Sequence, residues 1–262
     1  MRLSLLSALD SLIAPPPLAK RVEFLARQPF AHRGLHGDGV IENGRVAFSG
    51  AVALGHGIEL DVQAARDGEA FVFHDATLER LTGESGNFAD RSGSELDRIL
   101  LKGTNESIPR LPEILALVGG RAPILIEVKA PGVLVGVLCL SVRRALEGYR
   151  GEVAIMSFNP SVGRWFRHHA PRYVRGLVVT EQEEKGWIGA LRGRAKRHFS
   201  LWQAQPDFLA YDVRDLPSAF AAQQRARGLK VLTWTVRKEA QEQVAFAHAD
   251  EVIYEKPSQK AG

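Results

Sequence analysis

Cysteine is nearly absent from this chain of 262 residues, which contains only Cys139. A single cysteine excludes an intrachain disulfide and a zinc site built from several cysteines, and this composition fits a reducing compartment such as the cytoplasm. No run of about 18 apolar residues is present, so no transmembrane helix is expected. The chain also has no G-x-G-x-x-G turn after its first predicted strand and no G-x-x-x-x-G-K-[ST] phosphate loop, which argues against the common nucleotide-binding folds.

The remaining composition is that of a globular protein. Hydrophobic residues make up 45% of the chain and charged residues 24%, which excludes intrinsic disorder. The net charge of +4 and the pI of about 9.3 favour anionic ligands without identifying them. Basic residues are dense between Arg143 and Arg197. We interpret them as solvated helix faces rather than a nucleic-acid patch, and expect no nucleic-acid partner.

Residues 1–29 are predicted to form a helical extension before the main fold. Asp10 interrupts the short apolar stretch and no A-x-A site precedes the triple proline, so a signal peptide is not expected. Leucines recur here at roughly helical spacing. We expect a helix packed on the domain; the alternative is a weak membrane-surface contact that would make the protein peripheral at the membrane.

Short apolar runs alternate with helical patterns over the rest of the chain. The predicted strands are Phe30–His32, Gly57–Val62, Ile124–Val128, Val153–Ser157, Gly176–Thr180, Phe208–Tyr211, Val231–Thr235 and Glu251–Tyr254. The predicted helices are Gly44–Leu54, Leu111–Val118, Val133–Leu146, Ser161–His168, Pro217–Arg227 and Glu239–Ala247.

This alternation predicts an α/β fold of the (β/α)8 TIM-barrel class over residues 30–257. The competing fold is an open doubly wound sheet, which would use fewer strands. A short strand over Glu69–His74, joined by a turn at Arg66-Asp67-Gly68, interrupts the alternation. Residues 76–110 then form a small polar insertion between the second and third barrel strands, where it would cap the active face.

Acidic residues stand at strand ends that a barrel would bring together. Glu59 and Asp61 are two residues apart and therefore share a face of their strand, and Glu127 lies on the next strand. Carboxylates about 4 Å apart repel by roughly 4 kcal/mol at an effective dielectric near 20, so three together need a cation or partial protonation. Oxygen ligands suit Mg²⁺ or Ca²⁺. The alternative is a salt-bridge network in which Arg33 and Lys129 neutralise the acids.

Two histidines, His32 and His74, come from other strand ends at the same predicted mouth. Imidazole titrates near neutral pH, so one ring can act as a base and the other as an acid. Arg33 and Lys129 are suited to holding phosphate oxygens. Together with a divalent cation, these groups predict displacement at phosphorus.

Motifs along residues 30 to 256 resemble, in order, those of the glycerophosphodiester phosphodiesterase family. They are His32-Arg33-Gly34, Glu42-Asn43, Glu59-Leu60-Asp61-Val62, Asp67-Gly68, the run from His74 to Thr82, Pro109-Arg110-Leu111-Pro112-Glu113, Ile126-Glu127-Val128-Lys129, Ser157-Phe158 and Thr233-Trp234-Thr235-Val236. The resemblance implies a barrel with a small insertion, one divalent metal, and hydrolysis of glycerophosphodiesters to glycerol 3-phosphate and an alcohol.

The same resemblance implies roles for individual residues. The implied metal ligands are Glu59, Asp61 and Glu127, and the implied acid/base pair is His32 and His74.

Further residues are expected to bind the substrate. By the resemblance, Arg33 and Lys129 contact the phosphate, and Trp234 forms a wall against the glycerol portion. Glu42 matches a family glutamate that serves near the metal and the first histidine. Phe158 follows a strand end and is expected to line the pocket.

The chain departs from the family pattern at two places. Ile41 and Gly44 replace the usual proline and threonine around Glu42-Asn43, and residues 253–257 read I-Y-E-K-P where the family more often has I-T-D-x-P. These departures affect substrate-shaping loops rather than the reaction class. His36 lies near the predicted site in sequence and is interpreted as a structural or surface residue, as is His56.

Two other functions stay open at this point. A lysophospholipase D would cleave the same bond in a single-chain phospholipid, with the insertion and residues 1–29 accommodating the acyl chain. A barrel that binds phosphorylated ligands without turnover is the alternative from another class, and the presence of both histidines and all three carboxylates argues against it. We expect a small-molecule substrate, and the sequence does not predict an oligomeric state.

Overall fold

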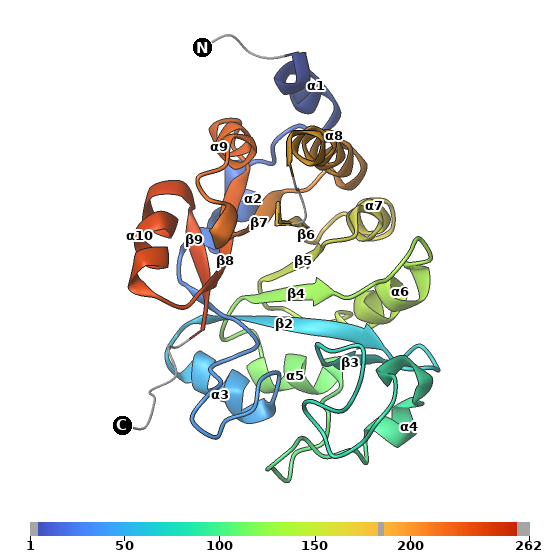
Figure 1. The fold of residues 1–262 in the computed structure, drawn as a ribbon. Helices are drawn as coiled ribbons and strands as arrows, with labels where there is room; N and C mark the ends of the chain where they lie inside the picture. The colour runs from blue at the N-terminus through green and yellow to red at the C-terminus, as the bar shows by residue number, and fades with distance from the viewer. Residues whose placement is uncertain (1–4, 183–185, 256–262) are drawn as a thin grey trace. The chain divides into compact units, whose positions relative to one another are not determined.

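Parallel strands alternate with helices along the chain, as predicted. The computed structural model describes residues 5–182 and 186–255 (Figure 1). Within them the strands of the alternation are β1 (Phe30–Ala31), β2 (Gly57–Ala64), β4 (Ile124–Val128), β5 (Val153–Ser157), β6 (Val174–Val179), β7 (Phe208–Asp212), β8 (Lys230–Val236) and β9 (Glu251–Tyr254). This is the strand and helix order of a (β/α)8 barrel, so the predicted fold class is confirmed.

The chain forms two compact units. One consists of residues 30–153 with Glu255, and we call it the 30–153 unit. The other consists of the described part of residues 1–29 and 154–254, and we call it the 154–254 unit. The predicted division into a 1–29 extension and a 30–257 barrel stays a prediction, and residues 1–4, 183–185 and 256–257 of those ranges lie outside the described residues.

In the 30–153 unit, β2 is the central strand. It pairs in parallel with β1 through Phe30 and Gly57, and with β4 through Asp61 and Glu127. The longer helices of this unit are α3 (Arg45–Ala53), α5 (Leu111–Val118) and α6 (Gly136–Ala145). Figure 1 shows α3 and α5 on one side of β2. Helix α5 ends at Gly119, whose left-handed backbone (φ 57°) closes the last turn.

The insertion between the second and third barrel strands has a hydrophobic core of its own. Its elements are β3 (Ala70–Val72), antiparallel to β2, followed by η2 (Phe88–Asp90) and α4 (Gly93–Leu96). The ring of Phe73 stacks on that of Phe88 with 5.2 Å between centroids. Both side chains are fully buried. This core fixes the loop that follows β3, which carries His74.

The 154–254 unit contains strands β5 to β9, which pair in parallel with their successors. Its main helices are α7 (Pro160–His169), α8 (Gly186–Ala204), α9 (Ala219–Ala226) and α10 (Glu239–His248), with a 3-10 turn η3 (Val213–Asp215). Buried apolar residues of β6, β7, β8 and α9 form its core, with Tyr211 the largest of them.

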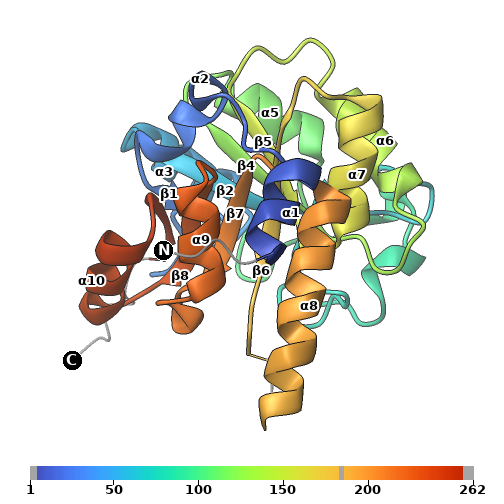
Figure 2. The ribbon, with the colours of Figure 1, turned by 90° about the horizontal axis from the view of Figure 1, so that it is seen from above.

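The N-terminal segment belongs to this second unit. Its elements are α1 (Leu5–Ile13), α2 (Ala19–Val22) and η1 (Glu23–Ala26). Figure 2 shows α1 lying beside α8. The buried carboxylate of Asp10 accepts hydrogen bonds from Trp202 (2.8 Å) and Gln224 (2.8 Å) and pairs with His198 Nδ1 (2.9 Å). In the described part of the chain, no helix is both long and apolar enough to cross a membrane.

Candidate active site

Three carboxylates are gathered on the neighbouring strands β2 and β4. Glu59 and Asp61 alternate along β2 and therefore share one face, and the parallel register sets Glu127 directly opposite Asp61. One ligand oxygen from each residue lies within 4.8 Å of the other two. All three side chains are buried. The predicted convergence of these acids is therefore present.

Two cationic side chains contact the acids. Lys129 Nζ lies 3.0 Å from Asp61 Oδ1 and 2.5 Å from Glu127 Oε1. Arg33 Nε lies 3.1 Å from Asp61 Oδ2, and the Arg33 backbone N–H donates to Glu59 Oε2 at 3.1 Å. The salt-bridge network considered as an alternative is thus present, but it leaves three buried carboxylates with two cations.

The donor set fits a divalent cation. Among the described residues, Glu59 Oε1 is buried and has no hydrogen-bond partner. A buried carboxylate oxygen without a partner is costly, and a cation is one way to satisfy it. Three carboxylates at this spacing match the all-oxygen coordination that hard divalent ions prefer. The structure therefore provides a cluster that could hold such an ion.

The three acids differ in the direction in which their surroundings shift the pKa. Burial raises the pKa of Glu59 well above its ordinary value, and repulsion from Asp61 and Glu127 adds to the effect. Burial likewise raises the pKa of Glu127. Burial alone would raise the pKa of Asp61 too, but Lys129 and Arg33 outweigh it and hold that pKa well below the ordinary range. The cluster would lose its mutual repulsion on binding a cation.

His32 lies between this cluster and a fourth carboxylate. Its Nδ1 is 2.6 Å from Glu255 Oε1, and its Nε2 is 3.9 Å from Glu59 Oε2. Burial lowers the pKa of His32 from 6.5, the charge of Arg33 lowers it further, and the hydrogen bond with Glu255 opposes the change. The ring is therefore held in one orientation with Nε2 toward the acids.

His74 is held in a similar way. Its Nδ1 is 2.7 Å from Asp75 Oδ1. Asp75 in turn accepts hydrogen bonds from Arg80, which also donates to both oxygens of Glu42 at 2.8 Å. Glu42 accepts a further bond from Arg33 at 2.7 Å. This chain of contacts connects the second histidine to the first strand's loop, and both imidazoles lie within electrostatic reach of Asp61.

The loop after β1 adopts an uncommon backbone. Arg33 (φ 54°) and Asn43 (φ 56°) are both in the left-handed region, which is rare for residues other than glycine. The Asn43 N–H donates to the Arg33 carbonyl at 2.9 Å, and the Asn43 side chain donates to Asp61 Oδ2 at 3.0 Å. Local backbone strain of this kind persists where surrounding contacts enforce it.

Two predicted substrate residues belong to the 154–254 unit. Phe158 follows β5 and Trp234 lies on β8, and their rings meet edge to face with 5.6 Å between centroids. The Trp234 indole donates to the Ala210 carbonyl at 3.0 Å. Phe158 is 45% exposed. The side chains of these two residues are therefore in contact. Their roles in substrate binding stay predictions.

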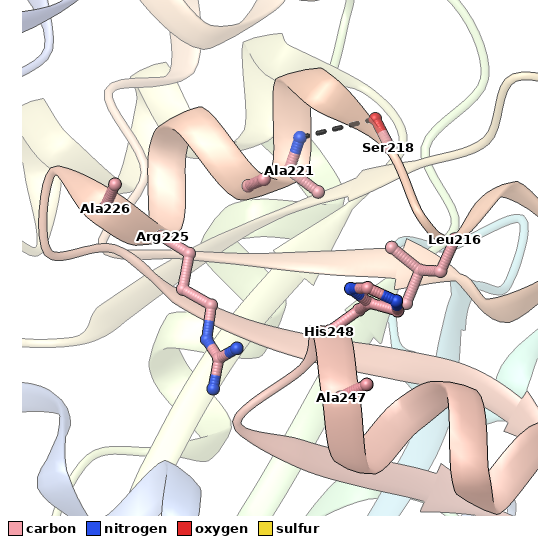
Figure 3. Close-up of a pocket in the computed structure, with 8 residues that line it drawn as sticks. Leu216, Ser218, Ala221, Arg225, Ala226, Ala247 and His248 are labelled. Carbon is pink, nitrogen blue, oxygen red and sulfur yellow. Dashed lines mark hydrogen bonds between the residues drawn. The ribbon is translucent and has the colours of Figure 1, made fainter. Parts of the chain in front are cut away.

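Two cavities also lie in the 154–254 unit. One of about 820 Å³ is lined by Phe158, by the end of β6 and by α8, including Arg192 and Lys196. The other, of about 390 Å³, lies between α9 and the end of α10 (Figure 3). In Figure 3, Ser218 accepts a hydrogen bond from the Ala221 N–H and so caps α9. None of the predicted site residues lines this second cavity.

Some members of the network were not singled out as functional residues in the sequence. Asn43, Asp75, Arg80 and Glu255 lie in or beside the motifs, but the sequence analysis gives them no role. Two of their contacts join residues that are distant in the chain: Glu255 is 223 positions from His32, and Arg80 is 38 from Glu42. Their position in or beside the matched motifs is the sequence feature that could have identified them as functional residues.

The fold and the site together define a class of protein. A (β/α)8 strand order, with buried carboxylates on neighbouring parallel strands and histidines after β1 and β3, is the layout of a barrel enzyme, whose active site lies at the carboxyl ends of its strands. The chain belongs to the glycerophosphoryl diester phosphodiesterase family, because the sequence model of that family matches residues 32–258. It is a phosphodiesterase-type hydrolase, so the predicted family and enzyme class are confirmed.

Known proteins agree with this assignment. A glycerophosphodiester phosphodiesterase of Caldanaerobacter subterraneus is 32% identical over 87% of this chain and 93% of its own length. A lysophospholipase D of Rattus norvegicus is 33% identical over 51% of this chain and 45% of its own length. A solved Oleispira antarctica phosphodiesterase, in complex with the product sn-glycerol-3-phosphate, has a TM-score of 0.74 at 22% identity, covering 88% of this chain and 93% of its own.

Proposed function

We propose that this chain hydrolyses glycerophosphodiesters to glycerol 3-phosphate and an alcohol at the site built around β2 and β4. In this proposal Glu59, Asp61 and Glu127 hold one divalent cation, Mg²⁺ or Ca²⁺. His32 and His74 act as the acid/base pair. The family assignment and the substrate named for the Caldanaerobacter relative support the substrate class.

The observation that carries the proposal is the unpartnered Glu59 Oε1 within the buried acidic cluster. The two cationic side chains leave one excess carboxylate charge among the three acids, and burial makes that charge costly. When bound there, a divalent cation would offset the negative charge that develops on the phosphate oxygens. Arg33 and Lys129 border the same carboxylates, where they can contact phosphate oxygens as well.

The two imidazoles are oriented for proton transfer. Each has a carboxylate at Nδ1, Glu255 for His32 and Asp75 for His74, which leaves the Nε2 atoms for the substrate. One ring removes the proton from the attacking oxygen while the other gives a proton to the leaving alkoxide. A P–O bond forms to the attacking oxygen and the P–O bond to the alcohol breaks.

The direct test is hydrolysis of glycerophosphocholine and bis(p-nitrophenyl) phosphate with Mg²⁺, with Ca²⁺ and with EDTA. We expect activity that needs the cation. His32→Ala and His74→Ala should each lower kcat by roughly 10²- to 10⁴-fold, and Glu59→Ala should abolish the response to the cation. His168→Ala, on the exposed face of α7, is the matched control. Variants at His32, His74 and Glu59 that all hydrolyse like the wild type would refute the site assignment.

A second substrate class is favoured by one specific observation. The cavity of about 820 Å³ combines the apolar side chains of Phe158, Leu177 and Val179 with the cationic Arg192 and Lys196. Such a lining suits the acyl chain of a single-chain phospholipid, and the lysophospholipase D relative fits this alternative. Phe158→Ala should then raise the KM for lysophosphatidylcholine and leave the KM for glycerophosphocholine unchanged. An equal effect on both substrates would reject the acyl-chain role of this cavity.

A further inference from the structure

A second cluster of side chains that could bind a metal lies on the Nδ1 side of the His32 ring, whereas the acidic cluster lies on its Nε2 side. Its members are His32, His36 and Glu255, and one ligand atom of each lies within 4.8 Å of the other two. We propose that these three residues form a second cation site, with a preference for Zn²⁺, and that a cation bound there inhibits hydrolysis. The inhibitory part rests on the function proposed above, whereas the binding part does not.

The geometry is close to that of a tetrahedral zinc site. Zinc lies about 2.0–2.2 Å from nitrogen or oxygen ligands, so two ligand atoms of a tetrahedral site are separated by about 3.3 Å. Glu255 Oε1 is 2.6 Å from His32 Nδ1 and 4.0 Å from His36 Nε2, one value below this separation and one above it. Small side-chain rotations would therefore suffice to bring the three atoms around one ion.

His36 provides a ligand atom that has no other use in the structure. Within the described residues, His36 Nε2 is buried and has no hydrogen-bond partner. The loop that carries it is fixed by backbone hydrogen bonds from Leu35 N–H to Ala47 (2.8 Å) and from His36 N–H to Gly34 (3.1 Å). A buried polar atom without a partner calls for an explanation such as an ion, and a cation shared with Glu255 would satisfy it.

The two clusters differ in their chemistry. The first offers carboxylate oxygens alone, which suit Mg²⁺ or Ca²⁺. The second offers two imidazole nitrogens and one carboxylate, the His₂Glu set that binds zinc with a fourth position open. The His32 ring separates them, because its Nε2 faces Glu59 and its Nδ1 faces Glu255.

The surrounding charge accommodates a second cation. Among the described residues, six carboxylates and three cationic side chains lie around the two clusters. The carboxylates are Glu42, Glu59, Asp61, Asp75, Glu127 and Glu255, and the cationic side chains are Arg33, Arg80 and Lys129.

A cation on this second site would interfere with His32. It would occupy Nδ1, displace the hydrogen bond to Glu255, and make Nε2 a poorer proton acceptor because the bound charge withdraws electron density from the ring. His32 could then no longer exchange protons with the substrate. Inhibition should therefore persist when the acidic cluster is saturated with Mg²⁺.

The test titrates Mg²⁺-saturated protein with Co²⁺, a spectroscopic substitute for zinc, and then with Zn²⁺. Visible absorption reports nitrogen-coordinated, four-coordinate cobalt, and equilibrium dialysis reports the number of ions bound. We expect one such site in the wild type and in the control His168→Asn. His36→Asn should weaken binding at least about tenfold and should raise the zinc concentration needed for inhibition by a similar factor.

His36→Gln provides a second variant, and thermal unfolding identifies any variant that does not fold. The proposal is overturned if the wild type shows no nitrogen-coordinated cobalt, or if both folded His36 variants bind cobalt and respond to zinc like the wild type. Because cobalt absorption does not depend on turnover, a protein that binds cobalt through His36 but does not hydrolyse glycerophosphodiesters would refute the proposed function and leave the binding site standing.

Discussion

Asn43 is the side chain that connects the loop after β1 to the buried acids. It donates to Asp61 Oδ2 at 3.0 Å, and its backbone holds the Arg33 carbonyl at 2.9 Å. Asn43 thereby orients a predicted metal ligand without being one itself. Partners of this kind commonly matter for metal affinity nearly as much as the ligands do.

Asn43→Gly isolates this contact, because glycine tolerates the left-handed backbone at φ 56° and removes only the side chain. We expect the affinity for Mg²⁺ or Ca²⁺ to fall by roughly 10- to 100-fold, measured by calorimetric titration. Asn105→Gly, in an exposed loop, is the control. Unchanged cation affinity in Asn43→Gly would show that Asp61 does not depend on this hydrogen bond.

The contacts of Arg80 predict how the stability of the fold changes at low pH. Its hydrogen bonds lower the pKa of Asp75, and burial, which would raise the pKa of Glu42, is outweighed by Arg80 and Arg33. A carboxylate whose pKa is lowered by folding stabilises the fold above its unfolded pKa of about 4, and this contribution is lost as the pH falls through the folded pKa.

Arg80→Met should therefore lower the free energy of unfolding by about 1 kcal/mol at pH 7, since the side chain is half exposed and solvent weakens its pairing. The difference from the wild type should shrink as the pH is lowered below about 4. Denaturant unfolding at pH 7 and at pH 3 measures it. A difference that grows toward low pH would contradict the assigned pKa directions.

At the level of single residues, the sequence predicted the members of the site better than their contacts. Glu59, Asp61 and Glu127 could be placed together because strand alternation and strand ends follow from the residue pattern. The Glu255–His32 contact could not, because it depends on how the chain's last described residue meets its first strand.

At the level of elements, the close approach of β1 and β2 positions His32. The Phe30 ring lies over Gly57, and a Cβ added to Gly57 would come within 2.5 Å of that ring. Phe30 is fully buried and has no room to move away. Glycine at this position in β2 therefore allows the first strand to approach, and His32 follows two residues later.

Gly57→Ala should cost about 1–3 kcal/mol of unfolding free energy because it overpacks the core beside Phe30. It should also lower hydrolysis, because displacement of β1 moves His32. Gly83→Ala is the matched control, since nothing lies within 4 Å of the added methyl group. Thermal unfolding and glycerophosphocholine turnover check both effects; a Gly57→Ala protein as stable and active as the control would refute this role for the glycine.

Elements were predictable where the residue pattern was regular. The strand over Ile124–Val128 and the helix over Leu111–Val118 appear with the predicted bounds, because one is apolar apart from Glu127 and the other ends at a glycine pair. The residue pattern did not predict α8, the longest helix within the described residues. Its sequence contains Gly186, Gly189 and Gly193 and many basic residues, which obscure a helical apolar stripe, and tertiary packing against α7 and α1 stabilises it instead.

At the scale of the whole molecule, a chain of net charge +4 nevertheless contains a cluster of three buried acids. The 30–153 unit and Glu255 supply every proposed metal ligand and both histidines. The proposed mechanism depends above all on Glu59, Asp61 and Glu127 together holding a divalent cation beside the two imidazoles. The family assignment is consistent with this role, and the arrangement of the buried acids supports it.

The most direct measurement is a crystal structure of the protein soaked with Mn²⁺, which replaces Mg²⁺ and can be located by its anomalous scattering. We expect one strong peak within coordination distance of carboxylate oxygens from Glu59, Asp61 and Glu127, and no such peak in Glu59→Ala crystals. A fully soaked crystal with no peak among these three side chains, or with its strong peak elsewhere, would contradict this expectation.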